Sequence, residues 1–381
     1  MPRDERPGKV QRMENPFRYG SVVTGQDFVD RDKELELLAK ELRSGQRILL
    51  FSNRRMGKSS LLKELARRYK KEFIFAHVDL YGVATRNKFL EQLVGEVSRA
   101  GYTTPEKVVS ALAEYIKGVR FRVVITRSGH VGIELDQADV RDNELAEVID
   151  FPEKVAKKRG KRVVVILDEF QEVLAIGGVP LVKTMRSRMQ YHAHATYIFS
   201  GSKRNLLRQL FLEKEGAFYK SVRPIELGPI SRSAFQDFIA DRFKAAGGHI
   251  DLKLAKRILD ASEGYPYYAQ QIAHELFDMT RSPTSAEEVE DAIAVAVEHQ
   301  MPAFLVLWDS IRSPLQRSYL LAVASEPRVP HGTVFIEKHR LRSYSHIQRI
   351  EKQLEARGLI ESGEIVDPMF ALWLRGLRRA P

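Results

Sequence analysis

Residues 47–62 hold the arrangement of side chains best suited to chemistry. The apolar run from Ile48 to Phe51 predicts a strand, and Gly57-Lys58-Ser59 follows it at the spacing of a phosphate-binding P-loop that opens a helix. Backbone N–H groups at such a helix start face phosphate oxygens. Lys58 is expected to reach the β- and γ-phosphates, and Ser59 to hold Mg²⁺. The residues expected to contact nucleotide in this loop are Ser52, Asn53, Arg54, Arg55, Met56, Gly57, Lys58, Ser59 and Ser60.

Ser52 departs from the motif, because it stands where a P-loop usually places its first small residue, glycine or alanine. Serine is still small, so nucleotide binding should survive the change. A serine forced into a backbone conformation reserved for glycine would be strained. We therefore predict that Ser52 has a φ below zero or carries strain. The alternative is a Gly-Lys-Ser tripeptide that occurs by chance in an ordinary strand–helix turn, and the flanking strand and helix argue against it.

A second stretch of the sequence with residues suited to catalysis ends in two adjacent carboxylates. The run from Val163 to Leu167 is apolar, as in a strand buried on both faces, and Asp168 and Glu169 follow it directly. Ligands of open parallel sheets bind at the carboxyl ends of the strands. Asp168 is expected to hold Mg²⁺ through water, and Glu169 to polarise the attacking water as general base. An ordinary strand with a helix cap is the alternative, and the P-loop about a hundred residues earlier favours catalysis.

The composition restricts the class of protein. A chain of 381 residues is expected to form two or three domains. Cysteine is absent, which excludes disulfides and thiolate metal sites, and the net charge of +11 suits contact with polyanions. No apolar run approaches the ~18 residues of a membrane span, and the charged start lacks a signal peptide. We expect no membrane partner and a cytoplasmic location.

These patterns predict an α/β fold: a parallel-sheet P-loop core, an all-helical lid domain and a C-terminal winged-helix domain. Buried strands are expected near residues 73–80, 161–168 and 195–202, and a Gly-containing hairpin near 120–135 reads as an insertion. Beyond residue 228 the strand pattern gives way to helical periodicity. The predicted divisions are a solvated tail at 1–16, the ATPase-type core at 17–228, the lid at 229–300 and the winged helix at 301–381.

The C-terminal segment predicts three helices followed by two short strands around a turn, which is the element order of a winged helix. Between Lys338 and Arg357 there are six lysine or arginine residues against two glutamates, so this segment is suited to phosphates and base edges. The alternative is a solvated helix face in a winged helix that binds protein. The residues expected to contact double-stranded DNA are Arg342, Tyr344, Ser345, His346, Gln348, Arg349 and Lys352.

Taken together, these features resemble the archaeal-type P-loop ATPases of the STAND branch of the AAA+ class. The resemblance extends from Asn15 to Arg375, over nearly the whole chain. Its carrying pieces are Asn15-Pro-Phe17, Phe28-Val-Asp-Arg-Asp-Lys-Glu-Leu35, Arg54-Arg-Met-Gly-Lys-Ser59, Leu167-Asp-Glu-Phe-Gln171, Gly201-Ser202, Gly264-Tyr-Pro266 and Asp367-Pro-Met-Phe-Ala-Leu-Trp-Leu-Arg375.

The resemblance implies ATP and Mg²⁺ as cofactors and assigns further roles. Phe28, Val29 and Arg31 are implied to lie near the adenine, and Gly264-Tyr265-Pro266 to contact nucleotide in place of a sensor arginine. A sensor of the γ-phosphate is implied after the strand that follows the carboxylates, where Ser200 and Ser202 stand. These two serines could equally cap the following helix. Where relatives often place an arginine finger, this chain offers Lys220 or Arg223.

Three functions remain open at this stage. The first is a slow ATP-driven molecular switch that re-aims a DNA-binding winged helix. The second is a DNA loader resembling replication initiators or transposition ATPases, which a clear arginine finger and a sensor arginine would favour. The third is a signalling or defence scaffold whose winged helix binds a protein partner. Self-association on ATP binding is left open by the sequence in all three.

Overall fold

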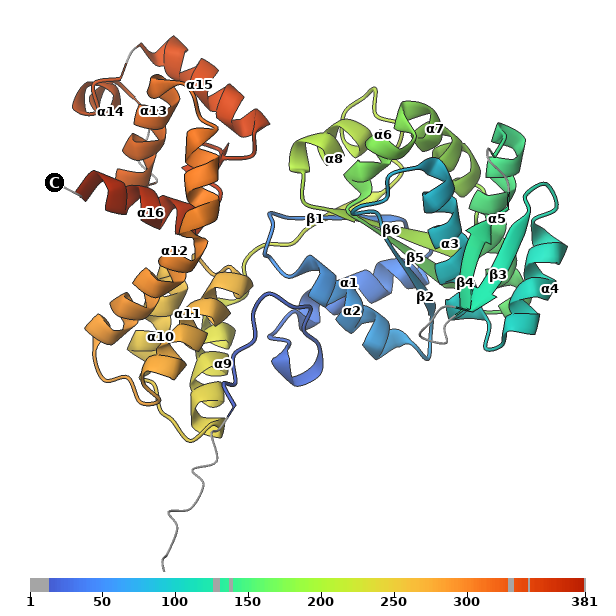
Figure 1. Cartoon of the computed structure of the whole chain (residues 1–381), viewed down its shortest axis with the longest axis horizontal. Coiled ribbons are helices and arrows are strands. Elements are labelled where there is room, and N and C mark those ends of the chain that lie inside the picture. The colour runs from blue at the N-terminus through green and yellow to red at the C-terminus, as the bar shows by residue number, and fades with distance from the viewer. Residues whose placement is uncertain (1–13, 126–130, 137–139, 328–331, 342, 380–381) are drawn as a thin grey trace, which may run out of the picture. The chain divides into compact units, whose positions relative to one another are not determined.

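The computed structural model describes residues 14–125, 131–136, 140–327, 332–341 and 343–379 (Figure 1). These residues form two compact units. We name the stretch 22–228 the sheet unit, and we name the described residues of 1–21 and 229–381 together the helical unit. None of the helices described is long and apolar enough to cross a bilayer.

The sheet unit is built on a five-stranded sheet whose order is β2-β5-β6-β1-β7. All neighbouring strands run parallel, which confirms the predicted α/β core. In register, Asp79 lies opposite Asp168 and Phe51 opposite Gly201, so the carboxyl ends of these strands share one edge. The strands are β1 (Ile48–Phe51), β2 (Ile74–Asp79), β5 (Val163–Asp168), β6 (Ala195–Gly201) and β7 (Arg223–Glu226).

Helices cover both faces of the sheet (Figure 1). One face packs its branched side chains against α1 and α2, and the other packs against the remaining helices of the unit. Each buried helix face removes apolar surface from water, which is the main stabilising contribution to this core. The helices are α1 (Asp32–Arg43), α2 (Lys58–Tyr69), α3 (Arg86–Gly101), α4 (Pro105–Tyr115), α5 (Asp142–Arg159), α6 (Val173–Ile176), α7 (Gly178–Met189) and α8 (Arg204–Phe211), with short 3₁₀ turns η1 (Gly25–Asp27) and η2 (Phe170–Glu172).

The predicted hairpin insertion is present as an antiparallel pair, β3 (Phe121–Ile125) and β4 (Val131–Leu135). It forms a sheet of its own and packs on α3, with Ile133 buried in the core. The residues of its predicted turn, 127–130, lie outside the described part of the chain. Sequence reasoning did not predict α4, which precedes the hairpin.

The segment Asn15–Ser21 belongs to the helical unit rather than to a tail or to the core. Phe17 is buried, and its ring contacts the rings of Phe243 and Phe277. The Asn15 side chain donates to the carbonyl of His274 at 3.0 Å. The predicted boundary between a tail ending at residue 16 and a core beginning at residue 17 did not anticipate this packing. The stretch is too short and too polar to show a hydrophobic periodicity.

In the first part of the helical unit, α10 (Leu252–Ala261) and α11 (Pro266–Met279) pack against α12 (Ala286–Asp309), and α9 (Arg232–Ala245) packs on α10. Helix α12 begins with a Ser285–Glu288 capping box and continues through Pro302, so the division predicted at residue 300 falls within it. Beyond that point Phe304 packs against Phe370 and Trp373, which supports the last turns of the helix.

The remaining elements of the helical unit follow in the predicted order. Two two-residue strands pair antiparallel after three helices, and a last helix closes the chain. These elements are α13 (Pro314–Ser325), α14 (Thr333–Lys338), α15 (Tyr344–Ala356), β8 (Ile360–Glu361), β9 (Glu364–Ile365) and α16 (Pro368–Arg379).

Candidate active site

The loop between β1 and α2 has the backbone of a tight turn. Arg55 (φ 68) and Gly57 (φ 83) take the left-handed conformation, and Gly57 is the N-cap of α2. Ser52 is not among the residues of positive φ, as predicted, so the strain of a serine in a glycine conformation does not arise. Met56 is buried, whereas Arg54 and Arg55 are exposed.

Lys58 is buried, and its ammonium group points back into the loop. Its Nζ donates to the Ser52 hydroxyl at 3.2 Å and to the carbonyls of Ser52 and Asn53 at 3.3 Å. Burial lowers the pKa of Lys58, against the opposing effect of Glu169 and Asp168. The serine that replaces the usual first glycine therefore has a role in the free loop, because its hydroxyl is one of three oxygens that hold the lysine.

The residues proposed for the metal fit a divalent ion. The Ser59 hydroxyl donates to Asp168 Oδ2 at 3.1 Å. Neighbouring ligands of octahedral Mg²⁺ stand about 3 Å apart, since the metal–oxygen bonds are about 2.1 Å. Burial raises the pKa of Asp168, but contacts with His77 and Ser200 outweigh it and bring the value to about 2. Asp168 is therefore a carboxylate at neutral pH, as a metal ligand must be.

Glu169 lies beside Asp168, and its carboxylate is held on two sides. The Ser202 hydroxyl donates to both carboxylate oxygens, at 3.2 and 3.0 Å, and the Gln171 side-chain amide donates to Oε2. Glu169 has a left-handed backbone (φ 49), which costs energy for a residue with a side chain. Backbone strain of this kind persists where neighbouring groups fix the geometry. Of the two predicted sensor serines, Ser202 contacts Glu169, and Ser200 is fully buried beside Asp168.

The Gln171 contact explains why glycine precedes Ser202. A Cβ placed on Gly201 would stand 2.2 Å from Gln171 Oε1, which is closer than any real contact allows. Any larger residue at position 201 would therefore push the Gln171 amide away from Glu169. Gln171 was not among the predicted site residues. A polar residue that is 3% exposed two positions after the carboxylates is recognisable only once the fold brings β6 beside it.

The stretch just before the residues expected near the adenine packs on α2. The Val23 N–H donates to the Ser60 hydroxyl at 3.1 Å, and the Gly25 N–H donates to Glu64 Oε2 at 3.1 Å. Val29 is buried and Phe28 packs against the core on this face. The Ser60 side chain, which was predicted to contact nucleotide, therefore accepts a hydrogen bond from Val23 instead.

Arg31 and its neighbour have unusual backbones in this segment. Asp30 (φ 50) and Arg31 (φ 77) are both left-handed. The buried Arg31 guanidinium donates to Glu34 Oε1 at 2.7 Å and to the carbonyl of Gly228 at 2.6 Å. Gly228 is the last residue of the sheet unit, so Arg31 fixes the point where the chain leaves that unit.

Glu64 gives this region a measurable pH dependence. Its carboxylate is fully buried between Arg67, Arg68 and the Gly25 N–H, and hydrogen bonds led by Arg67 lower its pKa to about 2 despite burial. A depressed pKa stabilises the fold above the unfolded value near 4.5, and this contribution is lost as the pH falls from there towards 2. We expect Glu64→Gln to lower the free energy of unfolding by about 2 kcal/mol at pH 7, allowing for solvent screening of the arginines.

Denaturant titrations at pH 7 and pH 3 test this. The difference between Glu64→Gln and wild type should shrink to about half at pH 3. Glu72→Gln, which removes an exposed pair with Arg43, is the matched control and should cost under about 0.5 kcal/mol. An equal Glu64→Gln effect at both pH values contradicts the assignment.

The two candidates for an arginine finger lie at the far edge of the sheet. Arg223 opens β7 opposite Ile48, at the amino end of the strands, where its Nε lies 3.3 Å from Glu41. Lys220 and Arg223 line an open hollow of about 630 Å³ together with residues of the α1 end. Lys58 stands at the opposite edge, so neither residue joins the P-loop of its own chain.

The Gly264-Tyr265-Pro266 loop opens α11 in the helical unit. Glu263 (φ 49) and Gly264 (φ 74) are left-handed, and a side chain on Gly264 would approach Pro229 at 3.1 Å. The Tyr265 hydroxyl donates to the carbonyl of Val366 at 2.8 Å. Its neighbour Tyr268 donates to Asp367 Oδ2 at 2.5 Å. No sequence pattern predicts these contacts, which join residues 101 and 99 positions apart in the chain.

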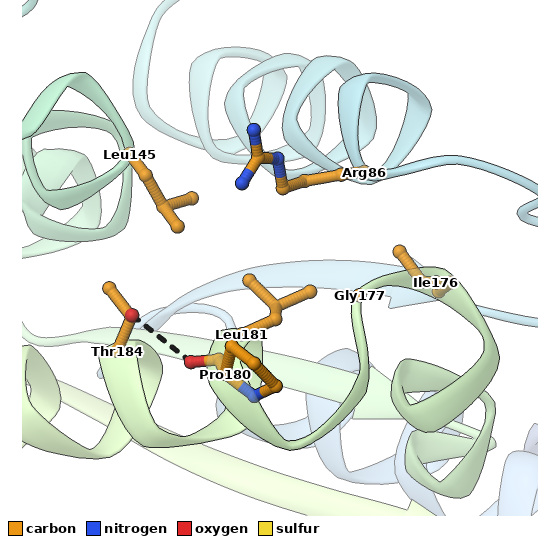
Figure 2. Close-up of a pocket in the computed structure, with 7 residues that line it drawn as sticks. All are labelled: Arg86, Leu145, Ile176, Gly177, Pro180, Leu181 and Thr184. Carbon is orange, nitrogen blue, oxygen red and sulfur yellow. Dashed lines mark hydrogen bonds between the residues drawn. The ribbon is translucent and has the colours of Figure 1, made fainter. Parts of the chain in front are cut away.

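A separate cavity of about 270 Å³ lies between α3, α5 and the α6–α7 turn. Figure 2 shows Arg86, Leu145 and Ile176 around it, with Thr184 donating to the carbonyl of Pro180 at 3.1 Å. These helices cover the face of the sheet opposite α1 and α2. The cavity is therefore not the phosphate site.

A family model described as an ATPase domain predominantly from Archaea matches residues 28–272. The chain belongs to this ATPase family. It is an ATP hydrolase, and the matched stretch contains the P-loop, Asp168, Glu169 and the Gly264-Tyr265-Pro266 loop. A search of curated proteins found no match to this sequence.

Solved structures share the fold of this ATPase. The Walker-type ATPase PABY2304 of Pyrococcus abyssi matches with a TM-score of 0.66 and 17% identity, over 92% of this chain and 97% of that chain. The ORC2 protein of Aeropyrum pernix, solved as ADPNP–ADP complexes, matches with a TM-score of 0.54 and 14% identity, over 92% and 95%. At these identities the likeness is one of fold.

Proposed function

We propose that this ATPase is an ATP-driven molecular switch of the STAND type whose helical unit carries a DNA-binding winged helix. The observation that carries the proposal is a pair of tyrosine hydrogen bonds, one from Tyr265 of the Gly264-Tyr265-Pro266 loop and one from Tyr268 in the first turn of α11. Tyr265 and Tyr268 bind the backbone of Val366 and the side chain of Asp367. Asp367 also accepts from the N–H groups of Met369 and Phe370, at the start of α16. A loop that senses nucleotide is thereby fixed to the C-terminal elements.

The chain's own residues account for the chemistry of the switch. Lys58 leaves its loop oxygens to bind phosphate, and Ser59 and Asp168 would hold a divalent ion. Mg²⁺, when bound, would neutralise phosphate charge. Glu169 accepts a proton from the attacking water, while Ser202 and Gln171 keep its carboxylate aligned. Hydrolysis changes what the Gly264 loop contacts, and the tyrosine bonds pass that change to α16.

The DNA output is supported by the surface of α15. Its apolar stripe of Ile347, Ile350 and Leu354 is buried, and the polar residues between are turned outward. Three helices followed by the β8–β9 pair have the element order of a winged helix. The predicted contacts Tyr344, Ser345, Gln348, Arg349 and Lys352 are exposed, and His346 is half-buried with its Nδ1 3.0 Å from Arg349. Arg342 lies outside the described residues.

The proposal is tested by titrating the full chain into duplex DNA with and without ATP. The mass of the complex and the rate of ATP hydrolysis are measured in the same experiment. We expect ATP to change DNA affinity and the affinity to fall steeply with salt. Arg349→Ala with Lys352→Ala should lower the salt slope by about two, while leaving hydrolysis unchanged. DNA affinity that is flat with salt contradicts the DNA output and favours a protein partner. A discrete sequence-specific footprint would favour a loader, and a rise in mass with ATP would give Lys220 or Arg223 a role in a neighbouring copy.

A further inference from the structure

His77 lies beside the metal-binding carboxylate and has no assigned role. It is in β2, next to the strand that ends in Asp168. Side chains alternate along a strand, so His77 shares a face with Phe75 and Asp79. Phe75 packs against the cluster that includes α2, which places this face on the side of the P-loop helix. The imidazole is 38% exposed, so water reaches it.

Two side chains, those of Ser59 and His77, converge on one carboxylate oxygen of Asp168. Asp168 Oδ2 is 3.1 Å from the Ser59 hydroxyl and 3.6 Å from His77 Nε2. The first separation suits two adjacent ligands of an octahedral ion. The second is longer than a direct hydrogen bond and suits a nitrogen that reaches the ion through one of its waters. Mg²⁺ keeps several waters when it binds protein and phosphates, so such a water is available.

We propose that His77 is an outer-shell residue of the metal site, whose Nε2 accepts a hydrogen bond from a metal-bound water shared with Asp168. It is a positioning residue, because it acts on the ion through that water. Outer-shell partners of this kind set metal affinity, and removing one typically costs about 10- to 100-fold. The proposal depends on Ser59 and Asp168 as metal residues and is independent of any DNA output.

The test is Mn²⁺ titrated into the protein–ADP complex, with free Mn²⁺ measured by electron paramagnetic resonance. We expect His77→Ala to weaken Mn²⁺ binding about 10-fold. ADP affinity in EDTA should stay within about twofold, because no metal is present there. His77→Gln keeps a hydrogen-bonding group and should restore most of the Mn²⁺ affinity. His194→Ala, which removes an exposed histidine at the opposite end of the sheet, is the matched control.

Two outcomes would overturn the role of His77. One is Mn²⁺ affinity within twofold of wild type in His77→Ala. The other is an equal loss of ADP affinity with and without metal, which indicates a structural role only. Asp168→Asn tests the metal site itself. If this variant binds Mn²⁺ as tightly as wild type, the ion binds elsewhere and the assignment of Asp168 as a metal ligand is wrong.

Discussion

Replacing Glu169 with glutamine is expected to lower ATP turnover about 100-fold or more, with ATP affinity within about threefold of wild type. Glutamine keeps the shape of the side chain and one oxygen that can accept hydrogen bonds from Ser202 and Gln171. It cannot accept the proton of the attacking water, so the chemical step fails while binding persists. Phosphate release in steady state, together with calorimetric ATP titration, separates the two effects.

A matched control for this variant is Glu172→Gln. Glu172 is an acidic neighbour that pairs with Lys203 at 2.8 Å, and its loss should leave turnover within about twofold. Gln171→Ala is expected to lower turnover by an intermediate factor, because Glu169 keeps its charge but loses one of the two side chains that hold its carboxylate in place. Equal turnover in wild type and Glu169→Gln would remove Glu169 from the role of general base.

Lys58→Ala is expected to weaken ATP binding about 100-fold. The ammonium group is the buried cation of the loop, and a charge-assisted hydrogen bond to phosphate contributes about 1.5–3 kcal/mol. In the free loop the same group satisfies the Ser52 and Asn53 oxygens, so alanine also loosens the turn. Titration of a fluorescent ATP analogue measures the loss directly.

Lys63→Ala is the control for Lys58→Ala. Lys63 is exposed on the same helix, and its substitution removes the same charge. Its ATP affinity should stay within about twofold of wild type. If both lysine variants lose affinity equally, the effect reflects net charge and the P-loop assignment fails. If neither does, nucleotide binds elsewhere.

Spacing along the chain was sufficient to predict the P-loop, the carboxylate pair and the strands that carry them. A continuous run of branched apolar residues is typical of a strand buried on both faces of a parallel sheet, and parallel pairing brings the carboxyl ends of such strands to one edge. The hairpin insertion and the order of helices in the helical unit also followed from periodicity.

The partners of these residues could not be predicted, because they depend on contacts between distant segments. Gln171 meets Gly201 only when β6 pairs with β5, and His77 reaches Asp168 only when β2 pairs with β5 on its other side. Phe17 carries no periodic signal, and its burial among Phe243 and Phe277 depends on the fold of the helical unit. Sequence patterns identify helices and strands. Which side chains lie next to each other on neighbouring strands is known only once the order of the strands in the sheet is known.

The tyrosine bonds of the Gly264 loop have a practical consequence for dissecting the enzyme. A protein cut after residue 300 would retain the P-loop, Asp168, Glu169 and the whole loop, and would look like a complete catalytic fragment. It would lack Val366 and Asp367, so the hydrogen bonds that Tyr265 and Tyr268 make to these two residues would be lost. A changed rate of ATP hydrolysis in such a fragment would then result from the loss of these two hydrogen bonds. It would be mistaken for release of the ATPase from inhibition by the C-terminal elements.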